Sequence, residues 1–488
     1  IALLVLDRVI SPYASAVRAR WKWATYVVAA LSVFAFTNFG QLHGVNGIVH
    51  PWEQYHFFVG SKYLGEVGYF DIYKATILAD REGTHELDDI RSTRDLHDFN
   101  LLGLEKAMAD KDRVRARFSD DTWADFKADW ANLSRWPAPW EDVVSDHGNS
   151  GSPAWALVAL PFVEMFGSSH TGQWLLASID MLLMAAMFAF LFRTFGSSTG
   201  AFGLVIWCLA PFCYDYLGGS ILRWDWLFAL GMAIGFYKRE RPIIAGAFLG
   251  YAILSKIFPI FFAFALGFRL IVESVRERRL HPHLWRLAAG AAGCAAVFVI
   301  ASSIVFGGPS IWKQYADRID VAQHEKYYPN QYSLKTVYLQ FVESTPHNLA
   351  HNLVKPAEIK QARADVDIAD HELGFLIVRV VFTLIALLVI ARLDPIDAFA
   401  AGPFLVFVWL TVNAYYWNML GLSALVLAAR QSRTERLSYA LIALNVTWGC
   451  YYLYQHLAWQ FAEGYFVALM LIVSFVVWCT QALSKLRG

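Results

Sequence analysis

Charge is scarce in this sequence. Only 17% of its 488 residues are Asp, Glu, Lys or Arg, against about 25% in an ordinary soluble domain. A large soluble protein needs a charged surface, so this composition disfavours a soluble fold. The formal net charge is zero, which removes the attraction to phosphates on which nucleic-acid binding depends. We therefore expect no nucleic-acid partner.

Motifs of several enzyme classes are also missing. The sequence has no phosphate-binding glycine loop, no HExxH, no GxSxG and no cluster of metal-ligand residues, so ATP hydrolysis and metalloprotease or serine-hydrolase activity have no support. We find no inverted repeat of the kind many secondary transporters show. The five cysteines all lie in apolar segments without a CxxC pair, so we expect them to pack as small hydrophobic residues.

What the sequence does have is long apolar segments. Hydrophobic residues make up 57% of the chain, and runs without a charged residue recur, as at 287–312 and 398–429. Each run can cross about 30 Å of hydrocarbon at about 1.5 Å per residue. We therefore predict an all-α polytopic membrane protein with about 11–13 transmembrane helices.

The predicted organisation has six parts. They are a cytoplasmic or interfacial N-terminus (1–23), a first transmembrane helix (24–41), a large acidic extracytoplasmic loop (42–151), a transmembrane core (152–306), a second extracytoplasmic loop (307–372) and C-terminal transmembrane helices (373–488). Basic residues precede the first span at Arg18, Arg20 and Lys22, so the positive-inside rule predicts cytoplasmic termini. We expect a bacterial-type inner (plasma) membrane.

Two topologies remain open for residues 242–268. In the preferred one, the basic cluster Lys238–Arg241 lies inside, 242–268 is a hairpin with Lys256 near its outer tip, and the short run 154–166 is re-entrant. In the alternative, 242–268 is one span that Pro259 kinks, because proline cannot donate the helical hydrogen bond. That alternative puts Lys238–Arg241 outside.

The long loop after the first span is net negative and divides in two. Its middle part, 87–133, has helical character with few breakers, and Gly, Pro and Ser punctuate its end. We predict a small helical cap. The stretch 87–146 would screen a cavity, select an acceptor or dock a membrane-protein partner.

Candidate chemistry begins just past the first span. A carboxylate, Glu53, lies between two imidazoles, His50 and His56, among aromatic residues close to the membrane surface. A carboxylate in such a place suits a general base. From spacing alone, solvated interfacial residues whose hydrogen bonds water satisfies explain the pattern at least as well.

Charged residues within apolar sequence form the second group of candidates. Arg223 and Asp225 would either hold two helices together or bind an anion, and Asp180 is expected to be a structural partner of a nearby cation. Lys256 needs a counter-charge, water or an anionic ligand, unless it snorkels to the interface. Residues 327–334 interleave aromatics with amides, which suits sugar recognition but also occurs in ordinary loops.

Four separated stretches carry a family resemblance. They are the membrane-proximal carboxylate segment (50–73), a Ser-Pro entry to an apolar run (151–163), an Ala-Gly-x-x-x-Gly…Lys-x-x-Pro segment (237–262) and an Asn-Gln-x-Ser-Leu segment (330–334). In this order they resemble the GT-C glycosyltransferases, especially family 87, the polyprenyl-phosphate-mannose-dependent mannosyltransferases (DUF2029-like). That family usually has an aspartate in the first loop with an aromatic four residues later. Glu53 and Phe57 fall on the pattern, with Glu in place of Asp.

The resemblance implies a GT-C-like bundle and inverting transfer of mannose, or another hexose or pentose, from a polyprenyl-phosphate donor to a lipid or glycan acceptor. It implies neither a cofactor nor a metal. Glu53 would be the general base, and Lys256 and Arg223 would bind the donor phosphate. His56 would assist at that phosphate or orient Glu53. The sugar- or acceptor-binding candidates are Asn330, Gln331, Tyr332, Tyr55 and Asp71.

Two other hypotheses stay open. The chain could be a transporter for a lipid or an anion, or a non-catalytic subunit built on a GT-C-like scaffold, which the Glu-for-Asp change would fit. The enzyme hypothesis requires that Glu53, His56, Lys256 and Arg223 meet in one cavity.

Overall fold

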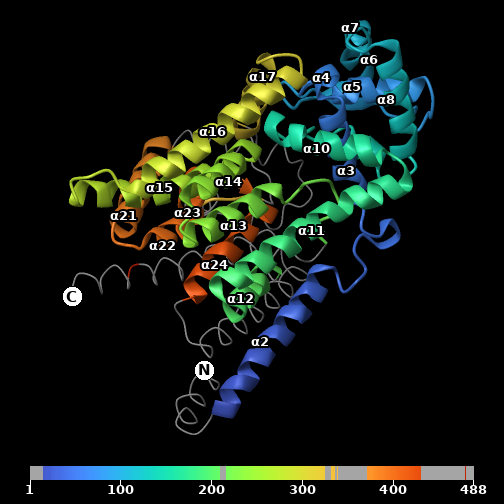
Figure 1. Ribbon diagram of the computed structural model, residues 1–488. Helices are drawn as coiled ribbons and strands as arrows, with labels where there is room; N and C mark the ends of the chain where they lie inside the picture. The colour runs from blue at the N-terminus through green and yellow to red at the C-terminus, as the bar shows by residue number, and fades with distance from the viewer. Residues whose placement is uncertain are drawn as a thin grey trace.

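The computed structural model describes residues 15–208, 216–324, 331–335, 338, 371–429 and 479. Over these residues the chain is an all-α membrane protein with two small antiparallel sheets of two strands each. A helical bundle carries a cap at one end (Figure 1). Of the predicted C-terminal transmembrane helices (373–488), residues 430–478 and 480–488 lie outside the described residues.

Among the described helices, three are long and apolar enough to cross a membrane: α11 (His170–Phe195), α16 (Pro282–Val305) and α21 (Glu372–Ile390). The bundle also contains α2 (Ser15–Phe36), α12 (Ser197–Cys208), α13 (Asp225–Lys238), α14 (Pro242–Ser255), α15 (Ile260–Arg276), α22 (Pro395–Ala400), α23 (Gly402–Trp409) and α24 (Leu420–Ala428).

Helices α14 and α16 pack with their backbones in close contact. A Cβ atom added at Gly246 would lie 2.1 Å from the carbonyl oxygen of Leu287, and one added at Gly290 would lie 2.0 Å from that of Ile243. Glycine at these positions therefore permits the close approach typical of small-residue interfaces in membranes.

The same contacts give the direction of the two helices. Gly246 meets Leu287 near the start of both, and the ring of Tyr251 packs on Phe298 further along both. Helices α14 and α16 therefore run parallel, so α15 between them must return. This confirms the hairpin expected for 242–268, with Lys256 at its tip, and rules out the single kinked span.

The basic clusters Lys238–Arg241 and Arg276–Arg279 gather at one end of the bundle, which we call the basic end. There Arg239 Nε donates to Thr194 Oγ1 at 2.9 Å. His283 Nε2 lies 3.1 Å from Glu240 Oε2. The ends of α11 and α13 therefore lie beside the start of α16, and the tip of the hairpin points away from them.

The cap, residues 44–151, lies at the opposite end (Figure 1). Its elements are η1 (Gly44–Asn46), α3 (Pro51–Lys62), α4 (Leu64–Val67), α5 (Ile72–Arg81), β1 (Ser92–Arg94), β2 (Leu101–Gly103), α6 (Leu104–Ala107), α7 (Lys111–Arg115), α8 (Asp120–Leu133) and α9 (Trp140–Val143). The predicted helical cap is therefore present, but its stretch 87–133 is not helical throughout.

A strand pair interrupts that stretch, with Thr93 of β1 opposite Leu102 of β2. The turn between the strands explains the difference. Asp95 Oδ1 accepts from the His97 backbone N–H at 3.0 Å, and Asp98 Oδ1 accepts from that of Asn100 at 2.9 Å. Short acidic side chains that bond backbone groups two residues on favour turns over helix.

Helix α10 (Pro153–Phe166) lies between cap and bundle. At its start Trp155 packs on Phe57 of α3, with ring centroids 5.1 Å apart. Just past its end Ser168 Oγ accepts from Asn132 of α8 at 2.9 Å. Both ends of α10 thus meet the cap, and the re-entrant course of 154–166 stays a prediction.

Two further segments close the space under the cap. Helix α17 (Ser310–His324) follows α16, and Figure 1 shows it beside the cap. Strand β3 (Gln331–Tyr332) pairs with β4 (Val412–Asn413), which leads into the 3-10 helix η2 (Ala414–Met419).

Candidate functional site

A cavity of about 540 Å³ lies where the cap meets the bundle. Its walls come from α3, the end of the cap, the loop 216–224, the hairpin tip, α17 and the segment 410–416. The charged and imidazole side chains that line it are Glu53, Asp146, Arg223, Lys256, Arg318, His50, His56 and His147. The four residues whose convergence the enzyme hypothesis required are among them.

Glu53 stands in the first turn of α3. Pro51 is the first residue of that helix, a position that suits proline. His50 caps the helix because its Nδ1 accepts from the Glu53 backbone N–H at 3.2 Å. The carboxylate of Glu53 faces the cavity, where Oε2 accepts from the Arg223 guanidinium and from Ser220 Oγ at 3.3 Å.

His50, the residue that caps the N-terminus of helix α3, is neutral at physiological pH. Burial lowers its pKa to about 4, against the partly opposing effect of the nearby Glu53 charge. A neutral imidazole keeps a lone pair on Nδ1, which is what the helix cap requires.

The loop 216–224 presents Arg223 to the cavity. Asp180 of α11 holds this loop, because its carboxylate accepts from the backbone N–H groups of Arg223 at 2.9 Å and Trp224 at 3.1 Å. Asp180 is therefore structural, as expected. Its hydrogen-bonding partners, however, are main-chain amides rather than the side-chain cation we had predicted.

The guanidinium of Arg223 is enclosed on several sides. It lies 4.7 Å from the ring centroid of Tyr415, a cation–π distance, as well as against Glu53. Asp225, two residues on, accepts instead from Tyr251 Oη at 2.6 Å and Ser255 Oγ at 2.8 Å. Arg223 thus pairs with Glu53, and Asp225 ties α13 to α14.

Lys256 occupies the hairpin tip, and its Nζ reaches the cavity. Nζ donates to the backbone oxygen and to Oγ of Ser150, each at 3.2 Å, and lies 5.8 Å from the ring centroid of Tyr416. Both oxygens of Ser150 are uncharged. The hydrogen bonds therefore position the ammonium group without neutralising it.

His56 lines the cavity, but hydrogen bonds occupy both of its ring nitrogens. Nδ1 donates to the Trp52 carbonyl at 2.8 Å, and the Tyr73 hydroxyl donates to Nε2 at 2.8 Å. Tyr73 in turn accepts from the Gly148 backbone N–H at 2.7 Å. Burial lowers the pKa of His56, which keeps the ring neutral. This arrangement holds α3, α5 and the end of the cap together.

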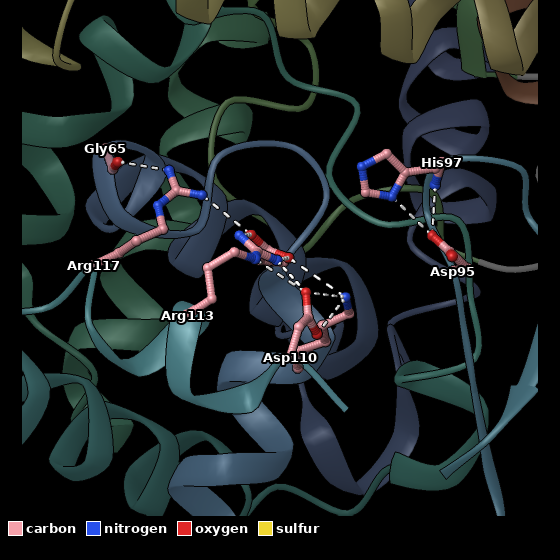
Figure 2. A network of polar contacts seen from close by, with 8 residues as sticks. Gly65, Asp95, His97, Asp110, Arg113 and Arg117 are labelled. Carbon is pink, nitrogen blue, oxygen red and sulfur yellow. Dashed lines mark hydrogen bonds and ion pairs between the residues drawn. The ribbon is translucent and has the colours of Figure 1, made fainter. Parts of the chain in front are cut away.

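Tyr55 and Asp71 do not line the cavity. Tyr55 is fully buried in the cap and shares a hydrogen bond with Thr76 at 2.7 Å. Arg113 contacts both carboxylate oxygens of Asp71 at 2.8 and 2.9 Å, and Arg117 contacts one at 3.1 Å. Figure 2 shows these two arginines. The side chains of Tyr55 and Asp71 therefore bond within the cap and lie outside the lining of this cavity.

The third candidate group reaches the cavity lining through a neighbouring strand, and neither Gln331 nor Tyr332 is among the lining residues that the structure describes. Gln331 and Tyr332 form β3, which pairs with Val412 and Asn413, and both of these line the cavity. Asn330 lies outside the described residues.

Three charged or imidazole residues of the lining were not among the sequence candidates: Asp146, His147 and Arg318. Asp146 Oδ2 accepts from Trp52 Nε1 at 2.7 Å, and its Oδ1 accepts from His147 Nδ1 at 2.9 Å. Arg318 of α17 donates to the His147 carbonyl and stacks over Phe99 at 4.4 Å. The one available signal was a charged or imidazole side chain, which by itself does not distinguish a cavity residue from any other.

Within the described ranges, no group of three or more His, Cys, Asp or Glu side chains is arranged to hold a metal ion. In the cavity the Glu53 carboxylate lies against Arg223. Two further cations, Lys256 and Arg318, come from separate elements. Such a site can accept a proton and stabilise a developing negative charge.

Comparison with protein families gives one match. The sequence model of a family described as Glycosyltransferase family 87 matches residues 151–402, more than half of the chain. The match includes Arg223, Lys256 and Arg318, while Glu53 and the cap precede it. A search of curated proteins and a search of solved structures returned no match.

Proposed function

Since the chain belongs to glycosyltransferase family 87 and is a membrane glycosyltransferase, we propose that it transfers a sugar from a polyprenyl-phosphate donor to an acceptor hydroxyl in the cavity under the cap. The transferred sugar is mannose or another hexose or pentose, and the acceptor is a lipid or a glycan. The transfer is direct and inverts the anomeric carbon.

One observation carries this proposal: Glu53, Arg223 and Lys256 line a single cavity although they come from α3, the loop 216–224 and the hairpin tip. A proton acceptor and phosphate-binding cations are the two things that the reaction needs in one place. Arg223 in contact with Glu53 sets the two functions side by side.

The rim of the cavity supports a lipid-linked donor. Ile257 lines the cavity and is exposed, and Ile260 and Phe264 continue an exposed apolar row along α15. Positions three and four residues apart share one face of a helix. A polyprenyl tail lying along this row in the bilayer would bring its phosphate to Lys256.

The reaction proceeds in one displacement. Glu53 takes the proton of the acceptor hydroxyl as the oxygen attacks the anomeric carbon, and the bond from that carbon to the phosphate oxygen breaks. The lipid phosphate leaves with the bonding electrons, and Lys256 and Arg223 stabilise its charge. A single displacement inverts the anomeric configuration.

We propose that the cap and cavity face away from the cytoplasm. Lys238–Arg241 and Arg276–Arg279 lie together at the basic end, which the positive-inside rule assigns to the cytoplasm. Tyr26 of α2 contacts Ser197 at the start of α12, so the N-terminal part of α2 also lies at the basic end. The proposed topology keeps both termini cytoplasmic and 307–372 on the cap side.

Glu53→Gln tests the proposal. The amide keeps the shape of the side chain but cannot take a proton, so we expect sugar transfer to fall by about 10²–10⁴-fold. Transfer is measured with radiolabelled polyprenyl-phosphate mannose and n-octyl mannoside in nanodiscs, and donor binding from tryptophan fluorescence. Donor binding should persist. Glu141→Gln, an exposed cap residue, is the control. Near-normal transfer by the Glu53→Gln variant would show that Glu53 is not the general base.

A further inference from the structure

The cavity has two chemically different walls. The bundle side carries Lys256 and Arg223, the cations assigned above to the donor phosphate, next to the apolar rim at Ile257. The cap side carries Trp52 and Asp146. A carboxylate repels a phosphate, so Asp146 has no part in holding the donor phosphate, and the proposed mechanism leaves it unused.

We propose that Asp146 and Trp52 form an acceptor subsite that binds the hydroxyl groups of a saccharide. The inference rests on the proposed function, because it assigns the second substrate of the same transfer to a wall of the same cavity. It adds specificity-determining residues that neither the sequence motifs nor the family match identifies.

The hydrogen bonds of Asp146 support this assignment. Each carboxylate oxygen accepts one bond, Oδ1 from His147 Nδ1 at 2.9 Å and Oδ2 from Trp52 Nε1 at 2.7 Å. A carboxylate oxygen can accept two, so each retains capacity. The side chain of Asp146 is 32% exposed and lines the cavity. The remaining capacity is therefore available to a ligand there.

The charge state of Asp146 determines which ligand groups fit. Burial by itself would raise the pKa of this carboxyl, but the hydrogen bonds from His147 and Trp52 hold the pKa well below its usual range. Asp146 is therefore ionised and can only accept hydrogen bonds. Sugar hydroxyls donate such bonds, and hydrogen bonds to a charged group are the strong ones.

The indole of Trp52 completes the subsite. Its bond to Asp146 fixes the ring, which lines the cavity. An aromatic ring offers a flat apolar surface with a polar edge, which matches the apolar face and hydroxyl edge of a pyranose. Trp52 precedes Glu53 in the first turn of α3. A saccharide held here lies in the same cavity as the base.

Arg318 does not contradict this arrangement. Its guanidinium donates to the His147 carbonyl and stacks over Phe99, so it fixes the backbone beside Asp146. Three histidines lie near the subsite. Burial lowers the pKa values of His50 and His56, and His147 donates a hydrogen bond to Asp146.

The test uses n-octyl mannoside and its monodeoxy analogues as acceptors, with the full-length protein in nanodiscs. For Asp146→Asn we expect the acceptor KM to rise about 10–100-fold, while kcat and donor affinity change less than about threefold. Wild type should discriminate against one deoxy analogue by a similar factor, and Asp146→Asn should lose that discrimination. Asp142→Asn, an exposed carboxylate of α9, is the matched control.

Trp52→Phe gives a second reading if Asp146→Asn folds poorly. It keeps an aromatic ring and removes the N–H that holds Asp146, so the acceptor KM should rise about three- to tenfold at unchanged donor affinity. An unchanged acceptor KM in both variants overturns the subsite. The subsite is also overturned if the variants lose only kcat or only thermal stability, or if the wild type binds the donor but no glycoside. Failure of the wild type to bind the donor would instead overturn the proposed function.

Discussion

Arg223 donates to the carboxylate of Glu53, and this contact joins the loop before α13 to the first long helix of the cap inside the cavity. The two side chains are 8% and 23% exposed, so the pair is largely shielded from water. Removing one partner of such a pair leaves a poorly solvated charge.

The first prediction follows from this contact. Arg223→Gln should destabilise the protein by about 1–3 kcal/mol, and the double variant Glu53→Gln/Arg223→Gln should recover about 1 kcal/mol or more of the summed loss, because each charge is costly only without the other. Thermal unfolding in nanodiscs measures the double-mutant cycle. Strictly additive losses would show that the two charges are not coupled.

Donor binding gives the second prediction. Lys256→Ala removes a cation whose present hydrogen-bond partners, the two oxygens of Ser150, are uncharged. We expect the donor KM to rise about tenfold or more, since a charge-assisted bond to phosphate is lost. Inhibition by free polyprenyl phosphate should weaken by the same factor.

Lys238→Ala is the matched control for that experiment. Lys238 has the same charge but is exposed at the basic end of the bundle. It should leave the donor KM unchanged. If both lysine variants raised the donor KM equally, the effect would be one of overall charge and not of the cavity.

The third prediction concerns pH and stability. The pKa of His50 is about 4 in the folded protein, against 6.5 for an unperturbed imidazole, the value we take for the unfolded chain. The unfolded state therefore binds more protons between these values. Stability should be fully present above about pH 6.5 and fall as the pH drops toward 4, by up to about 1.4 kcal/mol per pH unit from this one group.

His50→Asn isolates that contribution. Asparagine keeps an acceptor for the Glu53 backbone N–H, as a helix cap requires, but does not titrate. The slope of melting temperature against pH between about 4 and 6.5 should become shallower, although burial also lowers the pKa of His56, which leaves part of the slope. An identical slope in wild type and variant would mean that His50 is not buried in its neutral form.

The parts of the site that sequence could predict are those with a local signal. Glu53 follows a basic-flanked span, and Lys256 stands alone in an apolar run before Pro259. The hairpin followed from the requirement that the basic residues before 242 lie on the cytoplasmic side. Charge and hydropathy along the chain carry this information, so no knowledge of tertiary contacts was needed.

The other parts depend on partners far away in the sequence. Asp146 reaches Trp52 across 94 positions, and Arg318 reaches His147 across 171. No local pattern encodes these distances. For the same reason the sequence does not predict the contacts of Asp71 and His56. Nothing near these residues in the chain indicates that Arg113 bonds to the Asp71 carboxylate or that Tyr73 bonds to the His56 ring.

The fourth prediction separates a structural role of His56 from a catalytic one. Tyr73→Phe removes the hydroxyl that donates to His56 and accepts from Gly148, and it leaves the buried His56 Nε2 and the half-buried Gly148 amide without this partner. We expect a loss of about 1–3 kcal/mol in stability. His56→Gln should cost a similar amount. Both should reduce kcat less than about tenfold at a temperature where they are folded, without shifting its pH profile, because a group that transfers no proton sets no kinetic pKa.

Tyr69→Phe provides the comparison, because the Tyr69 hydroxyl is buried and donates to the Gly151 carbonyl without touching His56. The losses of His56→Gln and Tyr73→Phe should be non-additive, since both break one chain of hydrogen bonds, while those of His56→Gln and Tyr69→Phe should add. A folded, donor-binding His56→Gln protein whose kcat falls by about a hundredfold would instead support the catalytic role that the family resemblance implied for His56.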